Sequence, residues 1–310
     1  MTTPSASRRR LIGTATAKVP GACGELVQGY IDGRHFHVTC PIDFYSTVRV
    51  ELLPGSGRVV APADCPKARR AVEAALAHLR RVDVDAKLSI ESPLPREKGM
   101  ASSTADVVGA IKATAAALGK GLAPGDVALL AVSIEPSDGL MLEGIALFDH
   151  RTASLMESLG APPPMRILIL DFGGEVETLS FNAVDRSAQL AARESKWREA
   201  LSLVRDGLRR GEAALIAQGA TLSARTHQEI VPHPHFTDAL AFAKKVDALG
   251  VNIAHSGTVI GLLFDDDAAR VTRAEADARA TLIALQKTYA TRLIGVQPMR
   301  RATSRARAWL

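Results

Sequence analysis

Hydroxyl-bearing side chains gather in one short segment, Gly-Met-Ala-Ser-Ser-Thr at residues 99–104. Two cationic residues, Arg96 and Lys98, precede the segment, and an apolar periodic run follows it. Hydroxyl oxygens can ligate hard cations and bond phosphate oxygens, while cationic side chains neutralise the charge that develops during phosphoryl transfer. The segment therefore has the residue types of a phosphate-binding loop.

This segment lies where a helix is expected to begin. Residues 86–94 alternate apolar and polar side chains as a strand does, and prolines end that strand. From Ser102 onward apolar residues recur three and four apart, which predicts a helix that ends near Gly119. A helix N-terminus presents unpaired N–H groups and the positive end of the helix dipole, so it attracts anions. Gly99 lets the backbone come close to such an anion.

Helix capping is the alternative explanation of the same residues. Ser102 or Ser103 could cap the helix, with Asp106 close to the capping-box position. A cap needs one hydroxyl, whereas this segment supplies three behind a glycine, so we favour phosphate binding. The segment is not a Walker A motif, because Lys98 lies before Gly99 instead of directly before the serine.

The rest of the chain mixes strand and helix patterns, which predicts an α+β fold. Strands are expected at residues 17–53, 86–94, 139–151, 165–172, 250–265 and 290–297. Helices are expected at residues 65–82, 102–118, 124–135, 185–210, 211–230, 236–249 and 268–286. Three consecutive prolines at 162–164 are the best candidate for a linker between two domains.

Composition restricts the class of protein. The chain has 310 residues, of which 47% are hydrophobic and 23% charged, which suits one large or two medium globular domains. Its net charge of +5 owes much to arginines near the two ends, which are typical of solvated tails; nucleic-acid binding is therefore a remote alternative. These arginines are Arg8, Arg9, Arg10, Arg300, Arg301, Arg305 and Arg307.

Cysteines and apolar runs bear on the compartment. Three cysteines without a CxxC pair predict neither a disulfide framework nor a cysteine zinc site. No apolar run approaches the length of a bilayer span. We therefore expect a cytoplasmic protein with no membrane partner.

Three segments, in this order along the chain, resemble the kinases grouped with galactokinase, homoserine kinase, mevalonate kinase and phosphomevalonate kinase (GHMP kinases). Residues 19–29 are similar to the first motif of that family, residues 95–104 to its phosphate loop PxxxGLGSSA, and residues 254–264 to its third motif. The identical loop positions are Pro95, Gly99, Ser102 and Ser103. The substituted positions are Met100 for leucine, Ala101 for the second glycine and Thr104 for alanine.

The resemblance implies a two-lobed α+β fold with ATP and substrate meeting between the lobes. Residues 1–160 would form a lobe like ribosomal protein S5 domain 2, and residues 161–310 a ferredoxin-like lobe. Within the family the chain most resembles members that phosphorylate L-threonine to O-phospho-L-threonine for cobalamin side-chain synthesis. That implies a small-molecule acceptor. A homodimer is compatible with this assignment. Alternatives are a kinase for homoserine or another small alcohol, and a non-catalytic ligand-binding protein on the same fold.

The resemblance also implies roles for individual residues. The seven loop positions from Pro95 to Thr104 would bind ATP, and Ser103 with Glu135 would hold Mg²⁺. Ser103, Lys98 and Asp138 would serve catalysis. Asp138 could be a general base or orient the acceptor hydroxyl, but a turn aspartate often only bonds its own backbone.

An amino-acid acceptor brings an ammonium group, for which Glu25 and Asp43 are the natural partners. Each could equally be a strand-edge or turn residue, and for Asp43, close to a proline, that is the stronger expectation. The resemblance implies that the loop with Ser256, Gly257 and Thr258 closes over the phosphates and the acceptor; a tight turn is its structural alternative.

Two histidine pairs have the i, i+2 spacing of strand metal sites. They are His35 with His37 and His233 with His235. Neither pair has an evident third ligand nearby in the sequence, so we expect surface histidines or core histidines with satisfied hydrogen bonds.

Overall fold

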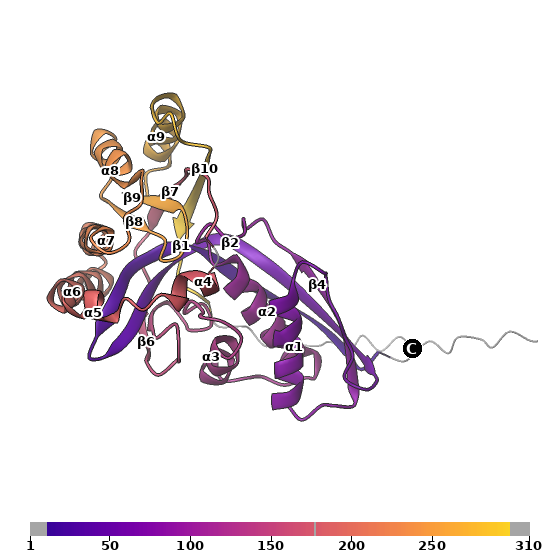
Figure 1. The fold of residues 1–310 in the computed structure, drawn as a ribbon. Coiled ribbons are helices and arrows are strands. Elements are labelled where there is room, and N and C mark those ends of the chain that lie inside the picture. The colour runs from indigo at the N-terminus through magenta and orange to yellow at the C-terminus, as the bar shows by residue number, and fades with distance from the viewer. Residues whose placement is uncertain (1–10, 177, 298–310) are drawn as a thin grey trace, which may run out of the picture.

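A computed structural model describes residues 11–176 and 178–297 of the chain (Figure 1). The arginine-rich ends of the sequence lie outside the described residues. The strands are β1 (Gly13–Ile31), β2 (Arg34–Pro54), β3 (Val59–Val60), β4 (Val84–Glu91), β5 (Ile145–Phe148), β6 (Met156–Gly160), β7 (Met165–Asp171), β8 (Gly250–Ile253), β9 (Val259–Asp265) and β10 (Lys287–Leu293). The helices are α1 (Pro66–His78), α2 (Ser102–Ala117), α3 (Pro124–Val132), α4 (Thr178–Ala183), α5 (Ser187–Ala191), α6 (Glu194–Arg210), α7 (Ala213–Gln228), α8 (Phe236–Lys245) and α9 (Ala268–Thr281).

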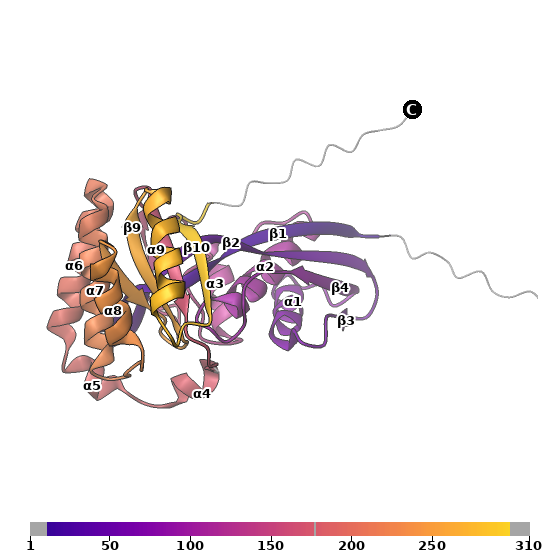
Figure 2. The ribbon, with the colours of Figure 1, turned by 90° about the horizontal axis from the view of Figure 1, so that it is seen from above.

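A long antiparallel hairpin of β1 and β2 runs through both halves of the molecule (Figure 2). Its two-residue turn is Asp32-Gly33, with φ angles of +50° and +77°. Two positive φ angles define the turn type whose twist suits a hairpin, and Asp-Gly is the sequence that adopts it most readily. The turn therefore fixes the register that pairs Ile31 with Arg34 and continues to the pair of Gly13 with Leu52.

This hairpin joins strands from the two halves into one sheet, ordered β1-β8-β9-β7-β10-β2-β4-β3. On one side β1 pairs with β8 through Glu25 and Ile253. On the other side β10 pairs with β2 through Leu293 and Ile42. Register shifts on both sides of Glu25 interrupt the pairing of β1 with β2. Such bulges bend a strand and redirect its side chains, so Glu25 lies at a point where β1 changes neighbours.

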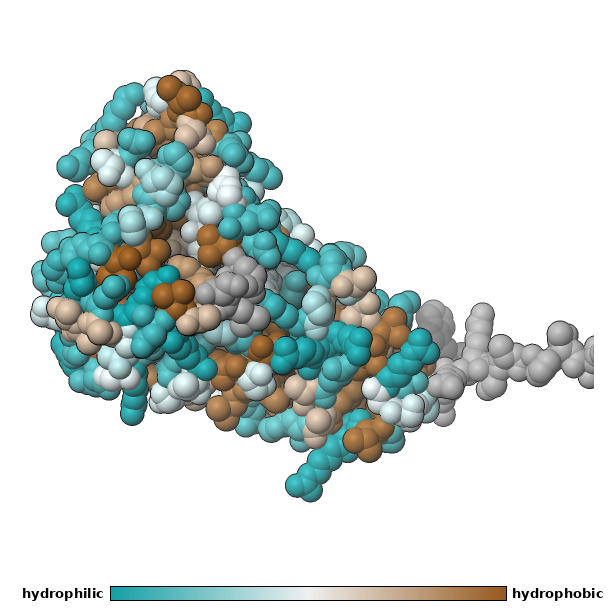
Figure 3. Space-filling model, viewed as in Figure 1, coloured by the Kyte–Doolittle hydropathy of each residue, from teal (hydrophilic) through white to brown (hydrophobic). Residues whose placement is uncertain are grey.

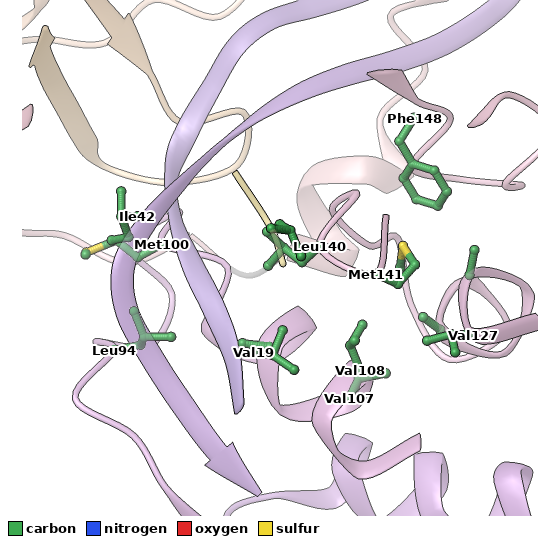
Figure 4. Close-up of a cluster of buried hydrophobic side chains, with 14 of the residues drawn as sticks. Val19, Ile42, Leu94, Met100, Val107, Val108, Val127, Leu140, Met141 and Phe148 are labelled. Carbon is green, nitrogen blue, oxygen red and sulfur yellow. The ribbon is translucent and has the colours of Figure 1, made fainter. Parts of the chain in front are cut away.

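Helices cover the sheet in two groups (Figures 1 and 2). The first group, α1 to α3, packs on the hairpin and β4, and α2 is buried on nearly all sides. Figure 4 shows Val107 and Val108 of α2 close to Val19 of β1. The second group includes α8 and α9, which bury a separate apolar cluster against β7, β8 and β9. Apolar burial of this extent is the main favourable term in folding.

Most of the predicted elements are confirmed. The helix predicted after the phosphate loop begins at Ser102, as expected. The helix predicted at 185–210 is interrupted and forms α5 and α6. Neither α4 nor β6 is predicted from the sequence; the side chains of β6 are at most half-buried and carry little apolar signal. No described helix combines the length and the apolarity needed to cross a bilayer.

The division into lobes at residue 160 stays a prediction. The three prolines do connect β6 with β7. However, the far end of β1 packs against the C-terminal half, where the Trp197 ring of α6 lies on Gly29 so closely that a Cβ there would come 2.6 Å from it. The hairpin is therefore shared by both halves.

Candidate active site

A cavity of 280 Å³ is lined by residues of both halves of the chain. Figure 3 shows that the molecular outline is angled where these halves meet. The N-termini of α1 and α2 open into it, together with the middle of β1, the segment that follows α3, and the loop that follows β8. Most of the residues predicted to do chemistry line this cavity. They are Glu25, Gly99, Met100, Ala101, Ser102, Ser103, Thr104, Glu135, Asp138 and Ser256.

The phosphate loop, residues 95–104, is fixed by its carbonyl groups. The carbonyl oxygens of Lys98, Gly99 and Met100 accept hydrogen bonds from the N–H groups of Thr258, Gly24 and Ala22, at 3.0, 3.1 and 3.0 Å. The Met100 side chain is buried, near Ile42 and Leu94 in Figure 4. Methionine can fill the place of the family's leucine because both are large and apolar.

Glycine at position 99 is required by a close approach of two loops. Its φ is +81°, and a Cβ there would lie 2.3 Å from Cβ of Ala254. A Cβ on Gly257 would in turn lie 2.5 Å from Cα of Gly99. The glycine therefore lets the phosphate loop pack against the loop after β8. The sequence had suggested a different role for Gly99, that of letting the backbone approach a ligand.

Two helix N-termini reach the cavity with uncapped N–H groups. The residue before α2 is Ala101, in the left-handed conformation with φ +54°, and no side chain caps this helix. Its α1 counterpart, Cys65, likewise provides no side-chain cap. Within the described residues, the N–H groups of Ser102, Ser103 and Thr104 have no acceptor. The capping explanation of the serines is therefore wrong, and the N–H groups are left for an anion.

Asp106 also departs from the capping-box alternative. It accepts a hydrogen bond from the Ser46 hydroxyl of β2 at 2.6 Å. Burial, as the largest effect, raises the pKa of Asp106. Asp106 thus binds α2 to the hairpin instead of closing its first turn.

The Ser103 hydroxyl donates a hydrogen bond to Oε1 of Glu135, a buried carboxylate that follows α3. The Lys67 ammonium, in the first turn of α1, donates to Oε2 of the same carboxylate at 2.5 Å. Hydroxyl and carboxylate oxygens are the ligands that Mg²⁺ prefers. The residues present therefore fit a hard divalent cation, with Lys67 beside it as a fixed positive charge.

The second acidic group of the cavity is a pair, Glu25 and Asp138. Burial, followed by the charge and the hydrogen bond of Asp138, raises the pKa of Glu25 well above its usual range. Burial also raises the pKa of Asp138, although its hydrogen bonds with Glu25 and Thr104 oppose that shift. Neighbouring carboxyl groups, one buried and the other half-buried, cannot both ionise easily, so a shared proton or a bound cation stabilises the pair.

Thr104 links this pair to the phosphate loop. Its hydroxyl donates to Oδ2 of Asp138 at 3.2 Å. Asp138 therefore lies between the loop that offers unpaired N–H groups and the buried Glu25. The cavity has an anion-binding end and an acidic end, joined at Asp138.

Some predicted site residues do not line this cavity. Lys98 turns toward the C-terminal half, where its ammonium donates to the carbonyl of Gly174 at 2.5 Å and lies 3.7 Å from Asp171. Asp43 is exposed on β2. Pro95 only begins the loop. Gly257 and Thr258 border a second cavity of 390 Å³ on the other side of the loop after β8.

Lys67 and the histidines of the cavity are site residues that the sequence did not predict. Lys67 follows Cys-Pro at the start of a helix, where acidic residues are more usual. A lysine at this unusual position is the sequence feature that could have identified it as a site residue. His37 was expected to be a surface residue or a satisfied core histidine, and this is wrong. It is 4% exposed, and neither ring nitrogen has a hydrogen-bond partner in the described part of the chain.

The other histidines of the two sequence pairs fit the expectation. His35 contacts the Ser187 hydroxyl at 3.3 Å, and His233 contacts the carbonyl oxygen of Thr258 at 3.1 Å. His235 stacks on Phe172. The i, i+2 spacing therefore carried no information about a site.

Family sequence models match both parts of the chain. The GHMP kinases N terminal domain matches residues 67–145, and the GHMP kinases C terminal domain matches residues 204–279. The chain belongs to the GHMP kinase family, as its motifs predicted, and is an enzyme of the phosphotransferase class. It is 36% identical over 273 residues to the L-threonine kinase of Salmonella typhimurium, a match that covers 86% of this chain and 89% of that protein. The L-threonine kinase of Citrobacter freundii is 35% identical, over 81% of this chain and 86% of that protein.

Solved structures share the fold at low sequence identity. Homoserine kinase from Cytophaga hutchinsonii superimposes with a TM-score of 0.70 at 15% identity, over 96% of this chain and 98% of that one. L. major mevalonate kinase in complex with R-mevalonate gives a TM-score of 0.68 at 15% identity, over 94% and 98% of the two chains. These structures confirm the predicted kinase fold.

Proposed function

We propose that the chain transfers the γ-phosphoryl group of ATP to the side-chain hydroxyl of L-threonine. The observation that carries the proposal is the two-ended cavity, in which unpaired N–H groups of a phosphate loop lie at one end and the carboxyl groups of Glu25 and Asp138 at the other. Phosphoryl transfer mainly requires positioning and charge neutralisation, and this arrangement offers both. Identity of 35–36% to L-threonine kinases over most of the chain supports the acceptor.

The anion-binding end would hold the triphosphate of ATP. The N–H groups of Ser102 to Thr104 and the dipole of α2 would contact phosphate oxygens, with Lys67 adding a positive charge. Ser103 and Glu135 would hold Mg²⁺, which supplies charge neutralisation at the phosphates when bound. Lys98, whose ammonium lies at Gly174 and Asp171, would position the loop through these contacts.

The acidic end would hold the acceptor. Glu25 would bind the ammonium group of threonine, because that nearby positive charge lowers the raised pKa of Glu25 and favours its ionised form, with the carboxyl proton released to solvent. Asp138 would accept the proton of the threonine hydroxyl while the hydroxyl oxygen bonds to the γ-phosphorus and ADP leaves. Ser256 is the residue of the C-terminal loop that could contact the acceptor, because Gly257 and Thr258 lie outside this cavity.

An acceptor panel tests this proposal. Purified protein with ATP and Mg²⁺ should form ADP with L-threonine, and the product should have the mass and chromatographic retention of O-phospho-L-threonine. L-Serine should be a poor substrate, because one methyl group discriminates by only about 1–3 kcal/mol. ADP formation with threonine no greater than with ATP alone would refute the acceptor assignment. Faster turnover of L-homoserine than of L-threonine would make homoserine the acceptor and leave the assignment of kinase activity unchanged.

The use of the product in cobalamin side-chain synthesis remains a prediction from the sequence. A homodimer and a cytoplasmic location likewise remain predictions.

A further inference from the structure

Three imidazoles form one wall of the cavity, next to its acidic end. His37 lies on β2, His150 follows β5, and His255 follows β8. Each offers a ring nitrogen within 4.8 Å of those of the other two. The fold thus brings together three imidazoles that are far apart in the sequence.

Most of these ring nitrogens lack a partner. Within the described residues, neither nitrogen of His37 or His150 has a hydrogen bond, and Nε2 of His255 has none. His37 is 4% and His150 is 2% exposed, so water does not readily replace the missing partners. Buried polar groups in proteins are nearly always paired. Their orphaned nitrogens therefore indicate a ligand.

The three rings are neutral and can donate lone pairs. Burial lowers the pKa of His37 to about 3, and lowers the pKa values of His150 and His255 well below their usual range. Nδ1 of His255 lies 2.6 Å from the side-chain oxygen of Gln28. An amide oxygen only accepts, so Nδ1 of His255 carries the proton and its free Nε2 carries the lone pair.

Neighbouring charges favour a cation over an anion. Nδ1 of His37 lies 3.6 Å from Glu25 and 3.7 Å from Asp138. These carboxyl groups would repel an anion, but they can accept the Nδ1 proton when Nε2 of His37 binds a metal. Imidazole ligands of metals usually donate their second N–H to such an oxygen. Gln28 already provides that oxygen for His255.

We propose that His37, His150 and His255 bind a transition-metal ion of the zinc class, for which neutral imidazole is a preferred ligand. The rings of His37 and His150 stack with centroids 3.7 Å apart, so one ring has to rotate to direct its lone pair at the shared ion. No hydrogen bond within the described residues holds either ring in the stack. The site differs in chemistry from the oxygen ligands of Ser103 and Glu135.

A bound ion would connect the two halves of the molecule. His37 and His150 belong to the N-terminal half, and His255 belongs to the loop that packs against the phosphate loop. A ligand that binds only the folded state stabilises it by RT ln(1 + [L]/Kd). Zn²⁺ should therefore raise the melting temperature as well as bind.

Cobalt spectroscopy of untagged, metal-free, full-length protein tests the site. Co²⁺ should produce the visible d–d absorption of a four-coordinate nitrogen-containing site, at about one ion per chain. Zn²⁺ should abolish this absorption and raise the melting temperature, while excess Mg²⁺ should do neither. Absence of the Co²⁺ absorption together with absence of a Zn²⁺-induced shift would overturn the proposal.

Variants locate the ion. His150→Ala and His255→Ala should each weaken Co²⁺ binding by more than about 100-fold, and Gln28→Ala by about 10-fold, as expected for a group that orients a ligand. His78→Ala, at an exposed histidine of α1, is the matched control and should bind as the parent does. Melting temperatures measured without metal identify any variant that fails to fold. If one of the three variants fails, the Co²⁺ affinities of the remaining two, which lie on different elements, still test the site. Unchanged Co²⁺ binding in the folded variants would place the ion elsewhere and refute the site.

Discussion

Glu25 and Asp138 lie next to each other in the cavity, close enough for Asp138 to raise the pKa of Glu25, although they come from different elements, one from a bulged strand and the other from a turn after a helix. The pair defines the acidic end of the site. Because Asp138 raises the pKa of Glu25 while Glu25 lowers that of Asp138, the loss of one carboxyl group changes the ionisation of the other. Substitutions of the two should therefore be compared side by side.

Asp138→Asn removes the group that would accept the hydroxyl proton. Loss of a general base typically costs 10²–10⁴-fold in rate, so we expect kcat to fall by about that factor, with little change in the KM for ATP. Steady-state kinetics with L-threonine measure the effect. A kcat within a few-fold of the parent would show that Asp138 only forms the turn.

Glu25→Gln keeps the shape of the side chain and removes the charge that would hold the acceptor ammonium. A hydrogen bond to a charged group is worth about 1.5–3 kcal/mol, which predicts a rise in the KM for threonine of roughly 10- to 100-fold. The KM for ATP should stay as in the parent. Should the ATP value rise and the threonine value stay constant, Glu25 would belong to the nucleotide end instead.

Ser103→Ala tests the phosphate loop. No side chain caps α2, so removal of this hydroxyl should cost only its hydrogen bond to the buried Glu135 carboxylate, about 1.5–3 kcal/mol of stability. Meanwhile kcat should fall by about 10²-fold, the scale of losing one transition-state contact. Ser133→Ala, at an exposed serine that bonds only its own helix, is the matched control. Loss of stability without loss of turnover in the folded fraction would favour a structural role for the Ser103 hydroxyl.

Gly257→Ala tests the contact between the phosphate loop and the loop after β8. Its Cβ would lie 2.5 Å from Gly99, which is too close without a shift of one backbone. We expect a destabilisation of about 1–3 kcal/mol and a higher KM for ATP, measured by urea unfolding and by kinetics. Gly121→Ala is the control, because a Cβ at that position meets no atom within 4 Å. Equal effects of the two substitutions would contradict the loop contact.

Lys112 of α2 provides a test of charge burial away from the site. Burial lowers its pKa to about 8, compared with about 10.4 in an unfolded chain. At pH 7 the folded protein therefore carries a buried positive charge at an energetic cost. Between about pH 8 and 10.4 the unfolded state binds more protons at this lysine than the folded state does, so the free energy of unfolding rises with pH. Lys112→Met should stabilise the protein by about 2 kcal/mol at pH 7, less at pH 10.

Urea unfolding of both proteins at the two pH values measures this difference. The exposed Lys120, just beyond α2, gives the control substitution Lys120→Met. A stabilisation that does not depend on pH would mean that improved apolar packing, and not the buried charge, accounts for the gain.

Local patterns predicted the elements, and the motif order predicted the family. The Ser102 helix start and the phosphate loop were recognisable because glycine, hydroxyl and apolar spacing occur within one segment. Lys67, His150 and His255 could not be assigned in the same way, since each is a single residue whose neighbours come from other parts of the chain. The partner of Gly99 was equally hidden: the sequence shows a glycine but not the Cβ of Ala254 that requires it.

The shared β1–β2 hairpin has a consequence for how such a chain can be divided. A fragment that ended at the three prolines would retain a hairpin whose far end, at Gly29, had lost the Trp197 ring that covers it. The site itself would lose the strand neighbour of Glu25, because Ile253 lies in the other half. The two halves are thus not interchangeable modules, and recombination or circular permutation would have to keep the hairpin together with both of its neighbours.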